Sequence, residues 1–264
     1  MTLVFDGGIE QEIQTRIRLY DYSTGQQSFF EWQAGMLGSV KNKRVLEIGC
    51  GDGEFWQYLL PCWQNCDITL TDINKKMLDV AKNKIGSYIP NDNRIQFDQV
   101  DFNDLTPLLG HRYDIIIANH NLFYAENIYR LLGVIFGMLN PRGVLICSTV
   151  GTDHLHELID LLRKRNANLP WLAETWAKRF GLENAYDTLS TIFPRVDQFE
   201  YDNFLHLPGP DPIKAYLMKT MKGQLSEWIE QHWEGISAEI QQVVDEKGHF
   251  RLTPHSGFCA ARKP

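Results

Sequence analysis

The sequence RVLEIGCGDG at Arg44–Gly53 is an apolar run followed by three glycines at alternate positions. β-Branched and aliphatic residues favour a buried strand, and glycine permits a tight turn that a ligand can approach closely. From Glu54 to Leu60 the apolar residues recur at helical spacing. The turn therefore leads to the amino end of a helix, where N–H groups and the helix dipole favour an anionic ligand. Strand, glycine turn and helix together predict a ligand site.

Two nucleotide-binding patterns are excluded at this turn. A GxGxxG dinucleotide fingerprint would place its third glycine at position 54, where the chain has Glu54, whose charge opposes a pyrophosphate. The chain also has no GxxxxGK[ST] run, which excludes a P-loop nucleotide phosphatase. The ligand is therefore expected to belong to another class.

β-Rich runs alternate with helical patterns between Arg44 and Val150. The predicted strands are Val45–Cys50, Ile68–Ile73, Ile95–Phe102, Tyr113–His120 and Val144–Val150, and the predicted helices are Glu54–Leu60, Lys75–Ile85 and Glu126–Leu139. This alternation predicts βαβ units and a parallel sheet with helices on both faces. Asn140–Gly143 is predicted to be a turn before the last of these strands.

The pattern changes after Gly151. Helices are predicted at Asp153–Arg165, Trp171–Phe180, Leu182–Ile192 and, as one long stretch, Ile213–Asp245; β segments are predicted at Val196–Phe204 and Phe250–Arg262. This region is too irregular for an independent domain. We therefore predict one domain over residues 1–264, with a core at 40–151 and a helical lid with the final strands at 152–264.

Glu47–Gly53 resembles ExGxGxG, the first motif of class I S-adenosylmethionine-dependent methyltransferases. Three further stretches match this family at its spacing: Thr71–Ile73 about 20 residues past the loop, Val100–Phe102, and Tyr113–His120. Leu139–Gly143 resembles the turn that precedes the family's fifth strand. The resemblance implies an α/β fold, with a Rossmann-like, mostly parallel sheet of seven strands and a helical lid.

The resemblance also implies a cofactor site at the carboxyl ends of the strands. Asp72 would accept hydrogen bonds from the ribose hydroxyls, Ile73 would pack on the adenine, Asp101 would reach the adenine amino group, and Phe102 would line the ring. Asp72 and Asp101 have an alternative role as caps of local turns at Asn74 and Asn103. The remaining implied contacts come from Glu47, Gly49, Cys50, Gly51, Gly53, Met77 and Asn119.

Most of the chain resembles a bacterial subgroup that methylates small molecules. The resemblance is carried by Arg18–Ser23, Ala118–Tyr124, Ser148–Leu158, Leu182–Ala185 and Ser256–Lys263. The chain departs from the subgroup at Ala185, where a glycine is expected, and in the extended helical stretch Ile213–Asp245. These departures concern the lid, and hence the choice of substrate.

The residues of the acceptor site carry less signal, because methyl transfer from a sulfonium needs a base only when the nucleophile must lose a proton. His120 follows the fourth strand and is the candidate general base, its alternative being a neutral, hydrogen-bonded structural histidine. Tyr22 and Tyr124 are candidates for positioning the substrate, or else for packing. Asp153–Glu157 has ligand-type side chains, but positions i and i+2 of a helix face apart, so no metal site is predicted.

Composition restricts the partners. The net charge is −7, which favours a small-molecule acceptor over nucleic acid. RNA or protein methylation, and a non-catalytic S-adenosylmethionine-binding subunit, are the alternatives. Five cysteines without a CxxC pair, no signal-peptide pattern and no long apolar run predict a cytoplasmic protein with no membrane span. The sequence gives no indication of oligomeric state.

Overall fold

The computed structural model describes residues 18–86, 89, 92–221 and 223–264. The chain forms two compact units that are interleaved along the sequence. The sheet unit consists of Gln27–Thr152, Trp176–Tyr201 and Ser256–Pro264. The helical unit consists of Asp153–Thr175, Asp202–His255 and the described residues up to Gln26. The division into a 40–151 core and a 152–264 lid stays a prediction.

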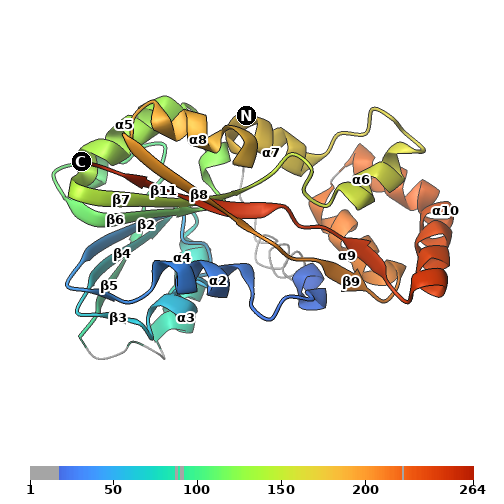
Figure 1. Ribbon diagram of the computed structural model, residues 1–264, viewed down its shortest axis with the longest axis horizontal. Helices are drawn as coiled ribbons and strands as arrows, with labels where there is room; N and C mark the ends of the chain where they lie inside the picture. The colour runs from blue at the N-terminus through green and yellow to red at the C-terminus, as the bar shows by residue number, and fades with distance from the viewer. Residues whose placement is uncertain (1–17, 87–88, 90–91, 222) are drawn as a thin grey trace. The chain divides into compact units, whose positions relative to one another are not determined.

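The sheet unit is built on a seven-stranded sheet in the order β5-β4-β2-β6-β7-β11-β8 (Figure 1). β11 is antiparallel to both of its neighbours, while the described pairs from β5 to β7 are parallel. The α/β prediction of a mostly parallel sheet is confirmed. The strands are β2 Arg44–Ile48, β4 Asp67–Asp72, β5 Arg94–Gln99, β6 Tyr113–Asn119, β7 Leu139–Val150, β8 Arg195–Tyr201 and β11 Ser256–Arg262.

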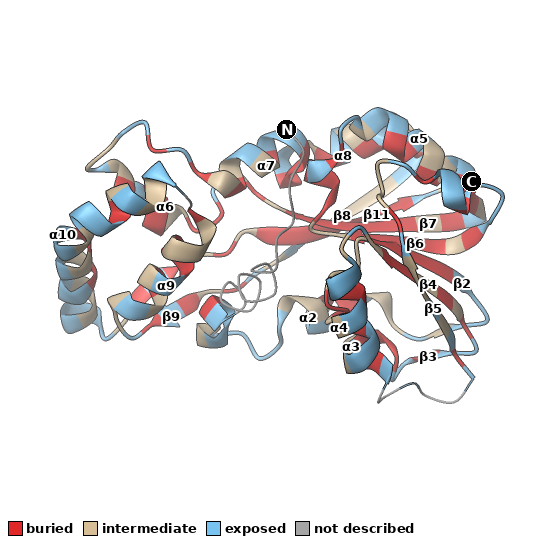
Figure 2. Ribbon diagram, turned by 180° about the vertical axis from the view of Figure 1, so that it is seen from behind, coloured by how far each residue is buried: buried red, intermediate tan, exposed pale blue. Residues whose placement is uncertain are grey.

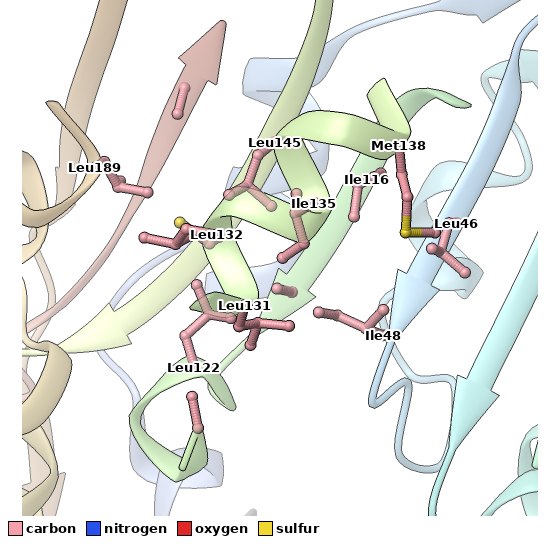
Figure 3. Packing of buried hydrophobic residues seen from close by; sticks show 14 of the residues in the cluster. Leu46, Ile48, Ile116, Leu122, Leu131, Leu132, Ile135, Met138, Leu145 and Leu189 are labelled. Atoms are coloured by element: carbon pink, nitrogen blue, oxygen red, sulfur yellow. The ribbon is translucent and has the colours of Figure 1, made fainter. Parts of the chain in front are cut away.

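Helices cover both faces of this sheet, as predicted. α5 (Ile128–Met138) and α8 (Leu182–Ser190) bury their apolar sides against one face. α2 (Phe29–Leu37), α3 (Trp56–Leu59) and α4 (Lys75–Gly86) pack on the other. Of the strands between them, β2, β6, β7 and β11 are largely buried, whereas the edge strands β5 and β8 are partly exposed (Figure 2). Figure 3 shows how side chains of α5 meet those of the strands; the labelled residues include Leu131, Leu132, Ile135, Leu46, Ile48, Ile116 and Leu145.

The predicted turn at Asn140–Gly143 is wrong in detail. These residues form an irregular part of β7: Leu139 pairs with Tyr113 and Val144 pairs with Ile115, so the intervening residues bulge out of the ladder. Arg142 has a left-handed φ of 64° at this bulge. The segment remains in the strand because Leu139 and Val144 both keep their partners on β6. Four short elements also belong to the described part of this unit: β1 Val40–Lys41 paired with β3 Trp63–Gln64, η2 Thr106–Leu108 and η3 Leu122–Tyr124.

The helical unit contains η1 Tyr20–Tyr22, α6 His156–Arg163, the start of α7 Leu172–Phe180, α9 Pro210–Thr220 and α10 Gln224–Lys247, with β9 Leu205–Leu207 paired to β10 Phe250–Leu252. The single helical stretch predicted at Ile213–Asp245 is two helices, because the backbone is extended at Met221 and left-handed at Gly223. The single β segment predicted at Phe250–Arg262 is two strands in different sheets. Pro254 lies between them and has no N–H to continue a ladder. Among the described residues, no helix is long and apolar enough to cross a membrane.

Candidate active site

The glycine turn lies at the carboxyl end of β2, at the edge where the parallel strands β4 and β6 also end. Gly49, Gly51 and Gly53 all have left-handed φ values, of 68°, 57° and 73°. A Cβ at Gly49 would lie 2.6 Å from Asn121 Nδ2, and one at Gly53 would lie 2.8 Å from Ile85 Cδ1. A Cβ at Gly51 would have nothing within 4 Å. Packing therefore requires two of the glycines, whereas Gly51 faces open space that a ligand can occupy.

Asp72 ties this turn to the end of β4. Its Oδ2 accepts a hydrogen bond from Gly51 N at 2.9 Å, and its Oδ1 accepts one from Asn74 N at 2.8 Å. Burial raises the pKa of the carboxyl above its ordinary value. The turn-cap role considered from the sequence is thus present, together with a contact to the glycine turn. The next residue, Ile73, is 43% exposed, an apolar side chain without cover beside this turn.

Glu47 lies in the interior, below the open edge. Its side chain is 1% exposed and accepts a hydrogen bond from Trp56 Nε1, which ties β2 to α3. Burial raises the pKa of Glu47 to about 8, and the bond from Trp56 offsets part of that rise. Cys50 donates its backbone N–H to Thr71 O at 2.7 Å, and burial raises the pKa of its thiol, which stays neutral. Met77 is also buried. For these residues the observed contacts are internal, and cofactor contact stays a prediction.

Asp101 forms the local turn that was its alternative role. Its Oδ1 accepts hydrogen bonds from Asn103 N at 2.9 Å and from Asn103 Nδ2 at 3.2 Å. Phe102 is partly buried and packs against the hydrophobic core on the side of the sheet that α5 covers. An adenine contact from either residue stays a prediction.

A group of buried amides lies where β2 and β6 end. Gln33, on α2, is fully buried and donates from Nε2 to Asn119 Oδ1 at 2.9 Å. Asn121 donates from Nδ2 to Ile48 O at 2.5 Å. Gln33 Oε1 and Asn121 Oδ1 have no hydrogen-bond partner among the described residues. Asn119 Nδ2 is close enough to Glu47 to lower the pKa of that carboxyl, without a hydrogen bond of good geometry.

Buried polar atoms of this kind normally acquire a partner. A bound polar ligand or an ordered water would supply one here. No motif in the sequence indicated Gln33; the only signal was a polar residue within the apolar stretch of α2.

His120 occupies a strained position at the end of β6. Its φ is 50°, and its N–H donates to both Ser148 O and Ser148 Oγ, each at 3.1 Å. The imidazole lies 5.0 Å from the ring of Phe29 and 6.2 Å from that of Phe30, measured between centroids. Left-handed backbone at a residue other than glycine is uncommon and concentrates at functional sites. The position is compatible with a role in catalysis, which stays a prediction.

Comparison with known proteins shows which family the residues at this edge of the sheet resemble. A model of the methyltransferase domain family matches residues 46–145, which include the glycine turn, Asp72, Asp101 and His120. Residues 46–145 are thus similar to methyltransferase domains.

Curated relatives of the chain are named malonyl-[acyl-carrier protein] O-methyltransferases. One from Ilyobacter polytropus is 32% identical over 134 residues, which cover 51% of this chain and 48% of that protein. One from Acinetobacter baylyi is 23% identical over 225 residues, covering 83% of this chain and 80% of that protein. The chain thus spans about half the length of the first of these relatives.

A solved structure of the YcgJ protein from Bacillus subtilis aligns with a TM-score of 0.56 at 15% identity, over 89% of this chain and 97% of that one. At this identity the likeness establishes the fold alone. It agrees with the seven-stranded sheet that contains the methyltransferase domain.

The two candidate tyrosines lie in different units. Tyr124, in the methyltransferase domain, is partly exposed and packs edge-on against Phe123 at 4.6 Å and Trp176 at 5.7 Å. Tyr22 is half-buried in η1 of the helical unit. Their roles in positioning a substrate stay predictions.

The Asp153–Glu157 stretch lies in the helical unit, and His154 is buried there. His154 Nδ1 accepts a hydrogen bond from His255 N at 3.1 Å, and Nε2 lies 3.0 Å from the Tyr20 hydroxyl. Nδ1 also lies 3.1 Å from the carbonyl oxygen of His255, so both backbone polar groups of that residue face the same ring nitrogen. Burial lowers the pKa of His154 to about 4. Both ring nitrogens thus have partners within the helical unit.

Proposed function

We propose that the chain is an S-adenosylmethionine-dependent methyltransferase that methylates a small-molecule acceptor at O, N or C. The observation that carries this proposal is the open, left-handed Gly51 turn tied to Asp72 inside the matched methyltransferase domain. Open α/β sheets bind ligands at the carboxyl ends of their strands, and both residues lie at that edge.

The residues present fit this cofactor. Gly51 leaves room for close approach of a ligand, Asp72 supplies a carboxylate for hydroxyl donors, and Ile73 supplies an exposed apolar side chain for a ring. The amides of Gln33 and Asn121 hold unpaired polar atoms nearby. When bound, S-adenosylmethionine supplies a methyl group on a positively charged sulfur, which is already a good leaving group.

The task of the protein is then mainly to position the acceptor and exclude water. His120 would accept a proton from an acceptor hydroxyl or amine and hold it on the imidazole during transfer. An acceptor that arrives as an anion would need no such base. In that case His120 would act through its position alone.

The names of the relatives suggest a first acceptor to try, a malonyl thioester of an acyl-carrier protein. The acidic net charge of −7 argues against nucleic acid as the acceptor. The described cysteines are free thiols, which fits work in a reducing cytoplasm.

The decisive experiment incubates the protein with S-adenosylmethionine that carries a labelled methyl group, with a fractionated cell extract, and separately with malonyl-acyl-carrier protein. We expect label in the small-molecule fraction or on the malonyl group. Label in RNA or in other proteins would overturn the assignment of the acceptor class. Cofactor binding without transfer to any fraction would identify a non-catalytic subunit.

Asp72→Asn is expected to weaken binding of S-adenosylhomocysteine by about 1–3 kcal/mol, because charge-assisted hydrogen bonds to the ligand hydroxyls are lost. Isothermal titration calorimetry measures the change. The matched control is Asp114→Asn, since Asp114 accepts a hydrogen bond from Arg44 N at 2.9 Å at the opposite end of the sheet. Equal affinity of wild type and Asp72→Asn would remove Asp72 from the site.

A further inference from the structure

Three rings meet at the carboxyl end of β6. The His120 imidazole lies beside Phe29 and Phe30, the first two residues of α2. Both phenylalanines are half-buried. Phe30 also contacts Phe55, the second residue after the glycine turn, at 5.4 Å between ring centroids. The three rings therefore lie next to the residues assigned above to methyl transfer.

The start of α2 is held in place from two sides. Ser28 caps the helix by accepting a hydrogen bond from Glu31 N at 3.2 Å. Tyr201, at the end of β8, donates its hydroxyl proton to Gln27 O. The Tyr201 ring also lies 5.7 Å from Phe29 and 5.2 Å from Trp32. Two backbone anchors and two ring contacts thus fix where the phenylalanines stand.

The backbone of His120 is fixed as well. Its N–H donates to both oxygens of Ser148, the residue at which the pairing of β7 with β6 ends. The left-handed φ directs the chain away from the line of the strand. The imidazole is therefore held against α2 by the backbone, and not only by ring contacts.

We propose that Phe29 and Phe30 are acceptor-positioning residues, which with His120 form an aromatic wall that binds the apolar carbon body of the acceptor, and that Tyr201 holds this wall in place. The inference rests on the proposed function, because it assigns the wall to the acceptor of that reaction. It adds the substrate class: an acceptor with an apolar chain or ring attached to its nucleophilic atom.

The chemistry of the wall supports this class. Partly exposed apolar side chains gain from being covered by carbon, so each methylene that the wall covers should raise the affinity. Phe29 meets His120 at 53°, a tilted contact of the kind that aromatic pairs prefer to a face-to-face stack. Phe30 has a partial role in packing, since it also contacts the core under α2. Phe29 is accordingly the better residue to test.

The experiment measures binding of butanoate, hexanoate, octanoate and decanoate to the whole protein by calorimetry, with S-adenosylhomocysteine present so that no transfer occurs. In wild type we expect affinity to rise at least tenfold from butanoate to decanoate. Phe29→Ala should lose about tenfold for decanoate with little change for butanoate, and Phe29→Leu should restore most of the loss. Tyr129→Ala removes an exposed ring from α5 and serves as the control.

Tyr201→Phe deletes the hydroxyl and keeps the ring. It should lower decanoate affinity less than Phe29→Ala does, and speed hydrogen exchange of the amides near Gln27. The proposal of an aromatic wall would be overturned if wild type bound all four acids with the same affinity, or if Phe29→Ala bound decanoate as tightly as wild type does. Failure of wild type to bind S-adenosylhomocysteine would instead contradict the proposed function, and the two failures are therefore distinguishable.

Discussion

Replacing Glu47 with Gln should remove a fall in stability of about 5 kcal/mol that wild type undergoes between pH 4.5 and pH 8. Glu47 is buried, and its pKa rises from 4.5 to about 8 in the folded protein. Each unit of pKa difference corresponds to about 1.4 kcal/mol. In the unfolded chain the carboxyl ionises near its ordinary pKa, so the stabilisation present below pH 4.5 is lost as pH rises through 8.

Urea unfolding at pH 4.5, 7 and 9 measures this effect. Across this range the free energy of unfolding of wild type should fall by about 5 kcal/mol relative to that of Glu47→Gln. The variant escapes this fall because Gln still accepts the hydrogen bond from Trp56 but does not titrate. Glu126→Gln, at an exposed residue before α5, is the control for loss of a charge. Parallel pH profiles for Glu47→Gln and wild type would show that the carboxyl is not held neutral in the fold.

The second large effect is acid lability from His154. Its pKa falls from 6.5 to about 4 on folding because the ring is buried. A group with a depressed pKa contributes fully above its unfolded value, so here the contribution is present above pH 6.5 and is lost as pH falls through 4. The expected loss is about 3 kcal/mol. The stability that depends on His154 is thus lost as the pH falls, whereas the stability that depends on Glu47 is lost as the pH rises.

Two measurements check this. At pH 5.5 the NMR chemical shifts of the carbon-bound ring protons of His154 should be those of a neutral imidazole, whereas an ordinary histidine is mostly charged at that pH. His154→Asn keeps an acceptor for His255 N and should flatten the pH dependence of unfolding between 6.5 and 4, even if it lowers stability at pH 7. His232→Asn, on the exposed side of α10, is the matched control. A ring that titrates near 6.5 in the folded protein would refute the burial argument.

The sheet unit was predictable because local patterns determine most of it. Alternating strand and helix periodicity identified β2, β4, β5, β6 and β7 to within a few residues. The Gly49–Gly53 turn was readable because left-handed backbone and close approach both demand glycine. Asp72 was placed beside this turn correctly, since parallel strands end at one edge.

The errors came from features with no local signature. The bulge at Arg142 depends on which residues of β6 hold partners, and the break at Pro254 depends on two strands joining different sheets. Gln33 meets Asn119 and His154 meets Tyr20 across large sequence separations. Periodicity reports which face of an element is apolar, but not which distant polar group will meet it.

The strand order has a consequence for synthesis on the ribosome. β8 ends at Tyr201 and cannot join the sheet until β11, which begins at Ser256, emerges and inserts between it and β7. At about 5–20 residues per second, the stretch from Val150, where β7 ends, to Ser256 takes on the order of 5–20 s to emerge, and the β7 edge stays unpaired for that time. During that interval the exposed edge can pair with a neighbouring chain, so expression at low temperature or with a chaperone that shields β edges should raise the soluble yield.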